Sequence, residues 1–129
     1  MNPGRWNTAG VPVVYTAESR SLASLEILVH AEDTSLLAAI HWVVLPVEID
    51  ESLIHVPRTL PNNWWRTPPS SATRIFGAAW AKRARTPVLR VPSAVTRGEF
   101  NYVLNPRHPE FAQLRIGKAA SFAFDHRTL

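Results

Sequence analysis

Prolines divide this chain into short apolar segments, and this limits the folds that it can adopt. The sequence of 129 residues contains 11 prolines. Proline fixes φ and lacks a backbone N–H, so it ends helices and sits in sheets mainly at edges and bulges. No repeat, heptad pattern or low-complexity tract extends across these breaks. We therefore expect a single domain over residues 1–129, with an α+β architecture and a bent or split sheet.

Several short segments have the composition of strands, because β-branched and aromatic residues dominate them or apolar and polar residues alternate. These segments are residues 11–15, 41–50, 87–91, 101–104 and the end of 108–125. Pro46 lies inside the second, which predicts an edge position or a bulge there. Pro92 ends the third, and Ser93 follows it directly. A side chain immediately after a strand end is well placed to meet a ligand.

Apolar periodicity predicts a first helix within residues 19–33. Ser19 or Ser21 can cap its N-terminus. Its apolar side chains recur at helical spacing, at Leu22, Leu25, Leu28 and Val29. Glu26 falls about 40° beyond Leu22 on the helical wheel, at the rim of this stripe. A carboxylate at that margin is either a solvated helix acid or half turned toward the element on which the helix packs.

A second helix is expected after Pro68-Pro69, with a following serine as its cap. Its apolar residues form an i, i+3, i+4, i+7, i+8 stripe, at Ala72, Ile75, Phe76, Ala79 and Trp80. This pattern predicts that the stripe is the core face. The basic residues of the same segment are expected to face solvent or a partner, and they are Arg74, Lys82, Arg83 and Arg85.

The connection before this helix, residues 53–69, contains two adjacent tryptophans in a polar loop. Neighbouring side chains of an extended segment point to opposite sides, so Trp64 and Trp65 cannot share one buried face. We expect one of them to pack on the core and the other to cover a pocket or meet a partner. Base stacking beside an arginine is the less favoured alternative.

The net charge of +4 combines two unlike halves. Residues 1–57 hold two basic and seven acidic side chains, whereas residues 58–129 hold 12 basic and three acidic ones. Twelve of the 14 basic residues are arginines, which suit bidentate binding of phosphate or carboxylate. The basic half therefore suits an anionic cofactor, an acidic protein face or nucleic acid, or it is a solvated surface.

Several other function classes find no support in the sequence. There is no cysteine, and no apolar run approaches the 18 or so residues of a membrane span. The five histidines do not pair with each other or with acids at metal-ligand spacing, so we expect no metal site. GxGxxG, P-loop and GxSxG motifs are missing as well. Without a signal-peptide pattern at Met1, a soluble cytoplasmic protein with no membrane contact is the expectation.

Nine ordered segments of the chain resemble the RES domain, the toxin half of RES–Xre toxin–antitoxin pairs. They are GRWN, PVVYTAES, SLEILVH, LPVEID, LPNNWW, TRIFGAAW, VLRVPSAV, NYVLNPRHPEF and SFAFDHR. The resemblance implies a compact ADP-ribosyltransferase-like fold. It also implies degradation of NAD⁺ by cleavage of the nicotinamide–ribose bond, either as a glycohydrolase or as a phosphorolase. NAD⁺ would be a substrate, and no prosthetic group is implied.

Four positions match the residues that this family uses. The resemblance implies catalytic roles for Glu26, Tyr15 and Arg5, and NAD⁺-binding roles for Arg5, Tyr15 and Ser93. Glu26 would stabilise the oxocarbenium-like transition state, as a carboxylate does in glycoside hydrolysis. The ring of Tyr15 would contact nicotinamide. Arg5 would bind the pyrophosphate bidentately, and Ser93 would hydrogen-bond a ribose or a phosphate.

The implied partners are NAD⁺ and an Xre-type helix-turn-helix antitoxin, with no direct binding of nucleic acid by this chain. Family members carry a further stretch ahead of GRWN, so we expect this chain to be short at its N-terminus. The sheet edge left unpaired would then favour a homodimer or antitoxin docking. Two alternatives remain open. One is protein ADP-ribosylation in the same pocket, and the other is a truncated, non-catalytic module that binds an acidic protein or nucleic acid.

Overall fold

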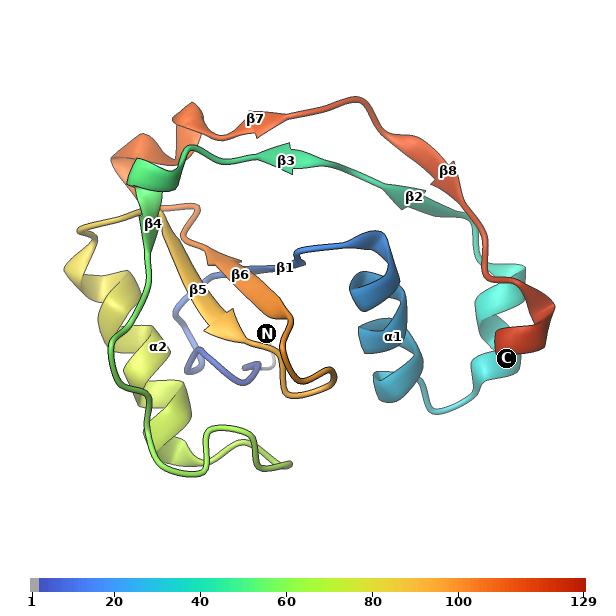
Figure 1. Cartoon of the computed structure of the whole chain (residues 1–129), viewed down its shortest axis with the longest axis horizontal. Coiled ribbons are helices and arrows are strands. Elements are labelled where there is room, and N and C mark those ends of the chain that lie inside the picture. The colour runs from blue at the N-terminus through green and yellow to red at the C-terminus, as the bar shows by residue number, and fades with distance from the viewer. Residues whose placement is uncertain (1–2) are drawn as a thin grey trace.

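The computed structural model describes residues 3–129, and its centre is a four-stranded mixed sheet of order β1-β6-β5-β4 (Figure 1). Its strands are β1 (Val14–Ala17), β6 (Phe100–Leu104), β5 (Val88–Pro92) and β4 (Ile54–His55). β6 pairs antiparallel with both β1 and β5, whereas β4 runs parallel to β5. A parallel pair needs a crossover, and the chain between β4 and β5 carries helix α2 (Ser71–Arg83).

A second pair of chain segments forms a narrow ribbon across the molecule (Figure 1). In it, β2 (Trp42–Val44) pairs with β8 (Ala120–Phe122), and β3 (Val47–Glu48) pairs with β7 (Arg115–Ile116). The sequence predicted one strand over residues 41–50 with an irregularity at Pro46. The structure has two short strands there, and the Pro46 carbonyl accepts a hydrogen bond from the Gly117 N–H at 2.7 Å. The α+β class with a split sheet is confirmed.

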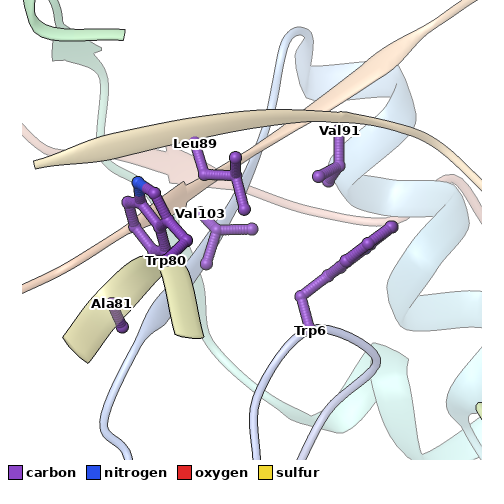
Figure 2. Close-up of a cluster of buried hydrophobic side chains, with 6 residues drawn as sticks. All are labelled: Trp6, Trp80, Ala81, Leu89, Val91 and Val103. Atoms are coloured by element: carbon purple, nitrogen blue, oxygen red, sulfur yellow. The ribbon is translucent and has the colours of Figure 1, made fainter. Parts of the chain in front are cut away.

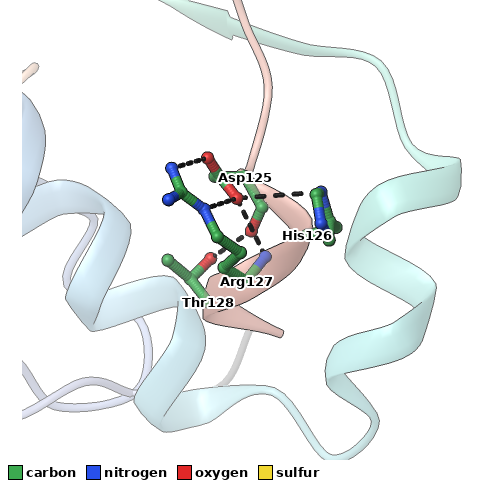
Figure 3. Close-up of polar contacts among 4 residues, drawn as sticks. All are labelled: Asp125, His126, Arg127 and Thr128. Carbon is green, nitrogen blue, oxygen red and sulfur yellow. Dashed lines mark hydrogen bonds and ion pairs between the residues drawn. The ribbon is translucent and has the colours of Figure 1, made fainter.

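Side chains cap the helices as the sequence suggested. Helix α1 (Arg20–His30) begins at Ser19, whose hydroxyl accepts a hydrogen bond from the Leu22 N–H at 3.1 Å. The structure also has four short 3₁₀ helices within residues 3–129, which are η1 (Thr34–Ala39), η2 (Glu51–Leu53), η3 (Pro109–Gln113) and η4 (His126–Thr128). Asp125 caps η4 and binds the Arg127 guanidinium through both carboxylate oxygens (Figure 3). None of the helices in residues 3–129 is long and apolar enough to cross a lipid bilayer.

The central sheet has a buried cluster on each face, because successive side chains of a strand point to opposite sides. On the α2 side, Leu89, Val91 and Val103 pack with Trp80, Ala81 and Trp6 (Figure 2). On the opposite side, the cluster consists of Leu53, Val88, Leu104 and Leu114. By the strand register, Tyr15 and Asn101 lie on the first of these two faces of the sheet, and Tyr102 and Arg90 lie on the second.

Helix α2 packs through a face that the sequence analysis did not choose. Its buried residues are Thr73, Gly77, Ala78, Trp80 and Ala81. Of the stripe predicted to be core, Trp80 is buried and Phe76 packs partly on Trp6, whereas Ala72 and Ile75 face outward and Ile75 is 59% exposed. The reason is Gly77, where an added Cβ would lie 1.8 Å from the carbonyl oxygen of Trp6. Because glycine lets the N-terminal chain approach this closely, the helix turns its small-residue side to the core.

Two further expectations differ from the structure. The strand expected at residues 11–15 is found at Val14–Ala17, since the chain before it forms a turn in which the Val11 N–H donates to Thr8. β4 was not expected at all, because two paired residues inside the connection 53–69 give no periodic signal. The prediction that one tryptophan of the pair packs on the core is confirmed, and the role of the other at a pocket or partner stays a prediction. Trp64 stacks on Trp6 with ring centroids 6.4 Å apart, and Trp65 is 55% exposed.

Candidate functional site

The candidate site is built on the chain segment of residues 4–11, which we call the N-terminal loop. Trp6, 2% exposed, anchors this loop between the sheet and α2. Its indole contacts Phe76 edge-on at a centroid distance of 6.0 Å and stacks on Trp64. Arg74 of α2 also holds the loop, because its Nε–H donates to the Gly4 carbonyl at 3.1 Å. The loop that carries Arg5 is therefore fixed from both sides.

Tyr15 ties the N-terminal loop to β1 through its hydroxyl. This group donates to Asn7 Oδ1 at 2.5 Å and accepts a hydrogen bond from the Trp6 N–H at 3.0 Å. Asn7 is itself buried, and its amide nitrogen donates to the Val11 carbonyl at 3.0 Å. Burial raises the pKa of the Tyr15 phenol, against smaller lowering effects from the Trp6 N–H and two nearby guanidinium groups. The hydroxyl thus has a structural task, while the residue remains 40% exposed.

Arg5 connects the N-terminal loop to residues 64–67 of the connection before α2. Its Nη1 donates to the carbonyl oxygens of Trp64, at 2.9 Å, and of Arg66, and its Nη2 donates to Thr67 Oγ1 at 3.1 Å. A guanidinium has five N–H donors, so Nε–H and the second Nη2 hydrogen retain capacity after the bonds found among the described residues. A guanidinium edge with two free N–H donors is the geometry that a phosphate or carboxylate binds bidentately.

Glu26 points from α1 toward the sheet and is half-buried. Its Oε1 accepts a hydrogen bond from Asn101 Nδ2 at 2.7 Å. The same amide nitrogen donates to the Thr16 carbonyl at 3.2 Å. Asn101 therefore links α1, β1 and β6 at one point and fixes the Glu26 carboxylate against the sheet. Of the two interpretations left open by the helical wheel, the structure supports the one in which the carboxylate faces the neighbouring element.

Arg5 lies close enough to Glu26, Tyr15 and Arg74 for all three to affect its pKa. Burial lowers the pKa of Arg5, and the nearby Glu26 carboxylate and Tyr15 phenol oppose this effect. Arg74 lowers the pKa of Arg5 further, because it places a second positive charge nearby. The site thus contains two guanidinium groups and one carboxylate on the α2 side of the sheet, with a half-exposed aromatic ring beside them.

Ser93 has a different environment from the other three. It is 2% exposed, and its Oγ accepts hydrogen bonds from the Val95 and Thr96 N–H groups at 3.1 and 3.0 Å. Its own N–H donates to the Glu99 carbonyl at 2.8 Å. The hydroxyl therefore holds the turn between β5 and β6. Both acceptor positions are used within the turn, so a substrate would meet Ser93 only through its O–H donor.

Sequence reasoning missed three residues of this site. Asn7 and Asn101 fix Tyr15 and Glu26, and nothing in a linear pattern marks an asparagine as a partner across 75 residues. Arg74 was expected to face solvent or a partner, but it is half-buried against the N-terminal loop. The helical wheel held a signal here, since Arg74 lies next to Gly77 and Thr73 on the true packing face.

A large cleft lies mainly on the other face of the sheet, against the ribbon that contains β2 and β3. It has a volume of about 1040 Å³, and Thr16, Arg90 and Tyr102 line it together with residues 43–47. Tyr15 and the start of α1 border it. Within residues 3–129, no group of three or more histidine and acidic side chains is arranged to hold a metal ion.

Comparison with known proteins identifies the family of the chain. The model of the family described as RES domain matches residues 1–125. The chain is 36% identical to the Prs ADP-ribosylating toxin of Sphingobium sp. (strain YBL2) over 130 residues, which cover 98% of this chain and 80% of that protein. It is 38% identical to Toxin Res of Yersinia enterocolitica over 125 residues, covering 96% and 82%. It is also 38% identical to Toxin Res of Photorhabdus laumondii over 127 residues, covering 96% and 80%. The chain therefore belongs to the RES domain family.

Proposed function

We propose that this chain is a toxin that degrades NAD⁺ by cleaving the bond between nicotinamide and ribose. The observation that carries the proposal is the placement of the Glu26 carboxylate, which Asn101 holds within electrostatic range of Arg5. Membership of the RES domain family, with relatives named as toxins, supports the same conclusion. Water as the acceptor gives nicotinamide and ADP-ribose, and phosphate gives nicotinamide and ADP-ribose 1″-phosphate.

The chemistry needs one carboxylate and no general acid. Nicotinamide leaves as a neutral molecule, because its ring nitrogen is positively charged in NAD⁺ and takes the bonding electrons. Positive charge then develops on the ribose, and Glu26 would stabilise it, as fixed groups of opposite charge do in other enzymes. The Asn101 hydrogen bond would reduce the motion of this carboxylate, so that little reorganisation accompanies the reaction.

Two arginines would hold the anionic part of the substrate. The remaining N–H donors of Arg5 would bind pyrophosphate oxygens, and Arg74 adds positive charge next to them. Tyr15 would contribute its exposed ring face to nicotinamide, because its hydroxyl is already bound to Asn7 and Trp6. Ser93 would act chiefly by shaping the turn after β5, with its O–H as a single donor toward the substrate.

The test is direct measurement of NAD⁺ turnover by the purified chain. Nicotinamide release is followed by liquid chromatography, in phosphate-free buffer and in buffer with phosphate, and the ribose product identifies the acceptor. Glu26→Gln should lower the rate by at least 100-fold, because the charge that stabilises the cation is lost while shape is kept. Glu32→Gln is the matched control, since Glu32 is an exposed acid just beyond the same helix. Equal rates for Glu26→Gln and the native chain would refute the proposal.

A second activity deserves the same assay, because one relative is named an ADP-ribosylating toxin. In that case the ADP-ribosyl group would move from NAD⁺ to a side chain of a protein. NAD⁺ labelled in its adenylate part distinguishes the two activities. Label that stays in small molecules supports cleavage by water or phosphate, and label that becomes protein-bound in the presence of cell extract supports transfer.

We also propose an Xre-type helix-turn-helix antitoxin as the protein that restrains this activity. The support is the family and the names of its relatives. Coexpression with the product of the adjacent gene tests it. A stable complex in which NAD⁺ turnover falls supports the proposal, and full activity in that complex contradicts it.

A further inference from the structure

A groove runs along the outer side of α2, away from the residues of the candidate site. It has a volume of about 530 Å³. One wall is α2 itself, through Ala72, Ile75, Phe76, Ala79, Trp80 and Arg83, and the other wall is formed by residues 55–61 and 85–86. From Ala72 to Arg83 the helix rises by about 16 Å. The groove is thus long and narrow, in contrast to the compact pockets that enclose small ligands.

The floor of this groove is the apolar stripe that periodicity predicted to be core. Because the Gly77 side of α2 faces Trp6, Ala72 and Ile75 of this stripe are exposed, while Trp80 is buried and Phe76 packs partly on Trp6. Ile75 is 59% exposed at its centre, and Phe76 is only partly buried. A partly uncovered apolar stripe on a helix, with small alanines at either end of it, leaves room for a second helix to approach closely.

The charged residues that line the groove are all basic. Arg83 and Arg85 lie at the C-terminal end of α2, Arg58 lies with His55 on the other wall, and all three arginines are exposed. None of the described residues that line the groove is acidic. Arginine and tryptophan are the residue types that most often dominate binding energy at protein interfaces. The groove therefore combines an apolar surface with three guanidinium groups, two of them at the C-terminal end of α2.

We propose that this groove binds an amphipathic helix of a protein partner, with apolar side chains along one face and acidic side chains at one end. The apolar side chains pack on Ile75 and Phe76, and the acids pair with Arg58, Arg83 and Arg85. A helix of about 12 residues is about 18 Å long and matches the length of the groove. The contact is separate from the Arg5–Tyr15–Glu26 site, so the proposal does not rest on NAD⁺ cleavage.

The experiment is a titration of the ¹⁵N-labelled chain followed by NMR. The probe is an acetylated peptide of about 12 residues, designed as a helix with leucines at i, i+3, i+4 and i+7 and glutamates in its last turn. Trp80 reports binding, since it lies in the groove and its indole N–H donates to Thr86 Oγ1 at 3.1 Å. Trp42 is the internal reference, because its indole N–H donates to the Leu37 carbonyl near the β2/β8 ribbon. We expect the Trp80 indole signal to move and the Trp42 signal to stay.

Matched variants distinguish specific binding in the groove from nonspecific electrostatic attraction of the peptide. Arg83→Glu should weaken binding at least tenfold, whereas Lys82→Glu, an exposed neighbour outside the groove, should change it by less than twofold. Ile75→Asp should abolish binding, and Val29→Asp, on the exposed face of α1, should not affect it. All four positions are exposed, and the amide spectrum of each variant verifies its fold.

Three results would overturn the proposal. The first is an unmoved Trp80 signal at millimolar peptide. The second is equal weakening by Lys82→Glu and Arg83→Glu, which would mean general charge attraction. The third is that ATP or inorganic phosphate alone moves the Trp80 signal with similar affinity, which would make the groove a site for small anions.

Discussion

Gly77→Ala tests whether the close approach of the N-terminal loop to α2 determines both the packing and the site. In the structure, a Cβ at this position would lie 1.8 Å from the Trp6 carbonyl oxygen and 2.6 Å from its carbonyl carbon. Non-bonded heavy atoms prefer separations of about 3.5 Å, so the loop and the helix would have to separate by about 1.7 Å. The colliding atoms belong to the backbone, which cannot rotate away as a side chain can.

The expected loss of stability follows from two opposing effects. Forcing extra volume into a packed contact costs about 3 kcal/mol or more, and displacement of the buried Trp6 adds to this cost. Alanine inside a helix is favoured over glycine by about 1 kcal/mol, which offsets part of it. We therefore expect Gly77→Ala to lower the free energy of unfolding by about 2–4 kcal/mol. In urea this moves the midpoint by roughly 1–2 M at an unchanged slope.

The same substitution should also affect NAD⁺ turnover. Arg5 precedes Trp6, and the Trp6 N–H binds the Tyr15 hydroxyl, so movement of the loop disturbs both site residues. We expect the rate to fall by more than tenfold at a temperature where the variant remains folded by circular dichroism. Ala79→Gly on the groove side of α2 is the control. It should cost about 1 kcal/mol through helix propensity alone and leave turnover unchanged. A Gly77→Ala protein as stable as the native chain would refute the packing argument.

Four further predictions address the hydrogen bonds of the site and its pH dependence. Asn101→Ala removes the 2.7 Å hydrogen bond to Glu26 and should reduce kcat for NAD⁺ cleavage by roughly tenfold. This corresponds to an increase of about 1.4 kcal/mol in the activation free energy, and KM should stay unchanged in steady-state assays. Asn7→Ala leaves the Tyr15 hydroxyl without its acceptor and should lower the free energy of unfolding by about 1–3 kcal/mol. Adding Tyr15→Phe to this variant should lower the free energy of unfolding little further, which a double-mutant cycle measured by urea unfolding tests. Burial raises the pKa of Tyr15, so the folded state holds the phenol proton more tightly than the unfolded state. The resulting stabilisation is complete below the ordinary tyrosine pKa near 10.0 and is lost as the pH rises through the folded-state pKa. Tyr15→Phe should therefore change the pH at which alkaline unfolding begins, and an unchanged pH would contradict this prediction. Ser93→Ala removes the acceptor for two N–H groups and should destabilise the chain by about 1–3 kcal/mol in urea unfolding, whereas Ser52→Ala, in an exposed turn, should cost far less.

The strands and helices were largely predictable because their signals are local. Ser19 is the cap of α1 as expected, and the segments that became β5 and β6 were expected within one residue of their bounds. β4 escaped prediction, since a strand of two residues is defined by its partner β5 and not by its own sequence. The same is true of the start of β1, which pairing with β6 places three residues later than the apolar run suggested.

For the candidate site, too, the long-range contacts were harder to predict than the local features. Arg5, Tyr15, Glu26 and Ser93 were named from a family resemblance, and the family itself is confirmed. Their catalytic roles remain predictions. Their surroundings were not predictable, because Asn101 reaches Glu26 across 75 positions and Arg74 reaches Gly4 across 70. Such contacts depend on which faces of helices and strands are turned inward.

The sequence alone determined where the chain can be regular, because prolines, caps and apolar periodicity act over a few residues at a time. Which face of α2 is buried was decided only in the tertiary structure. The periodicity favoured Ile75 and Phe76, yet the backbone of Trp6 fits only against Gly77. Packing is a property of two surfaces together, so one glycine with space for a carbonyl oxygen outweighed the apolar stripe. That choice placed Arg5 beside Tyr15, and it left Ile75 exposed in the groove that contains Arg83.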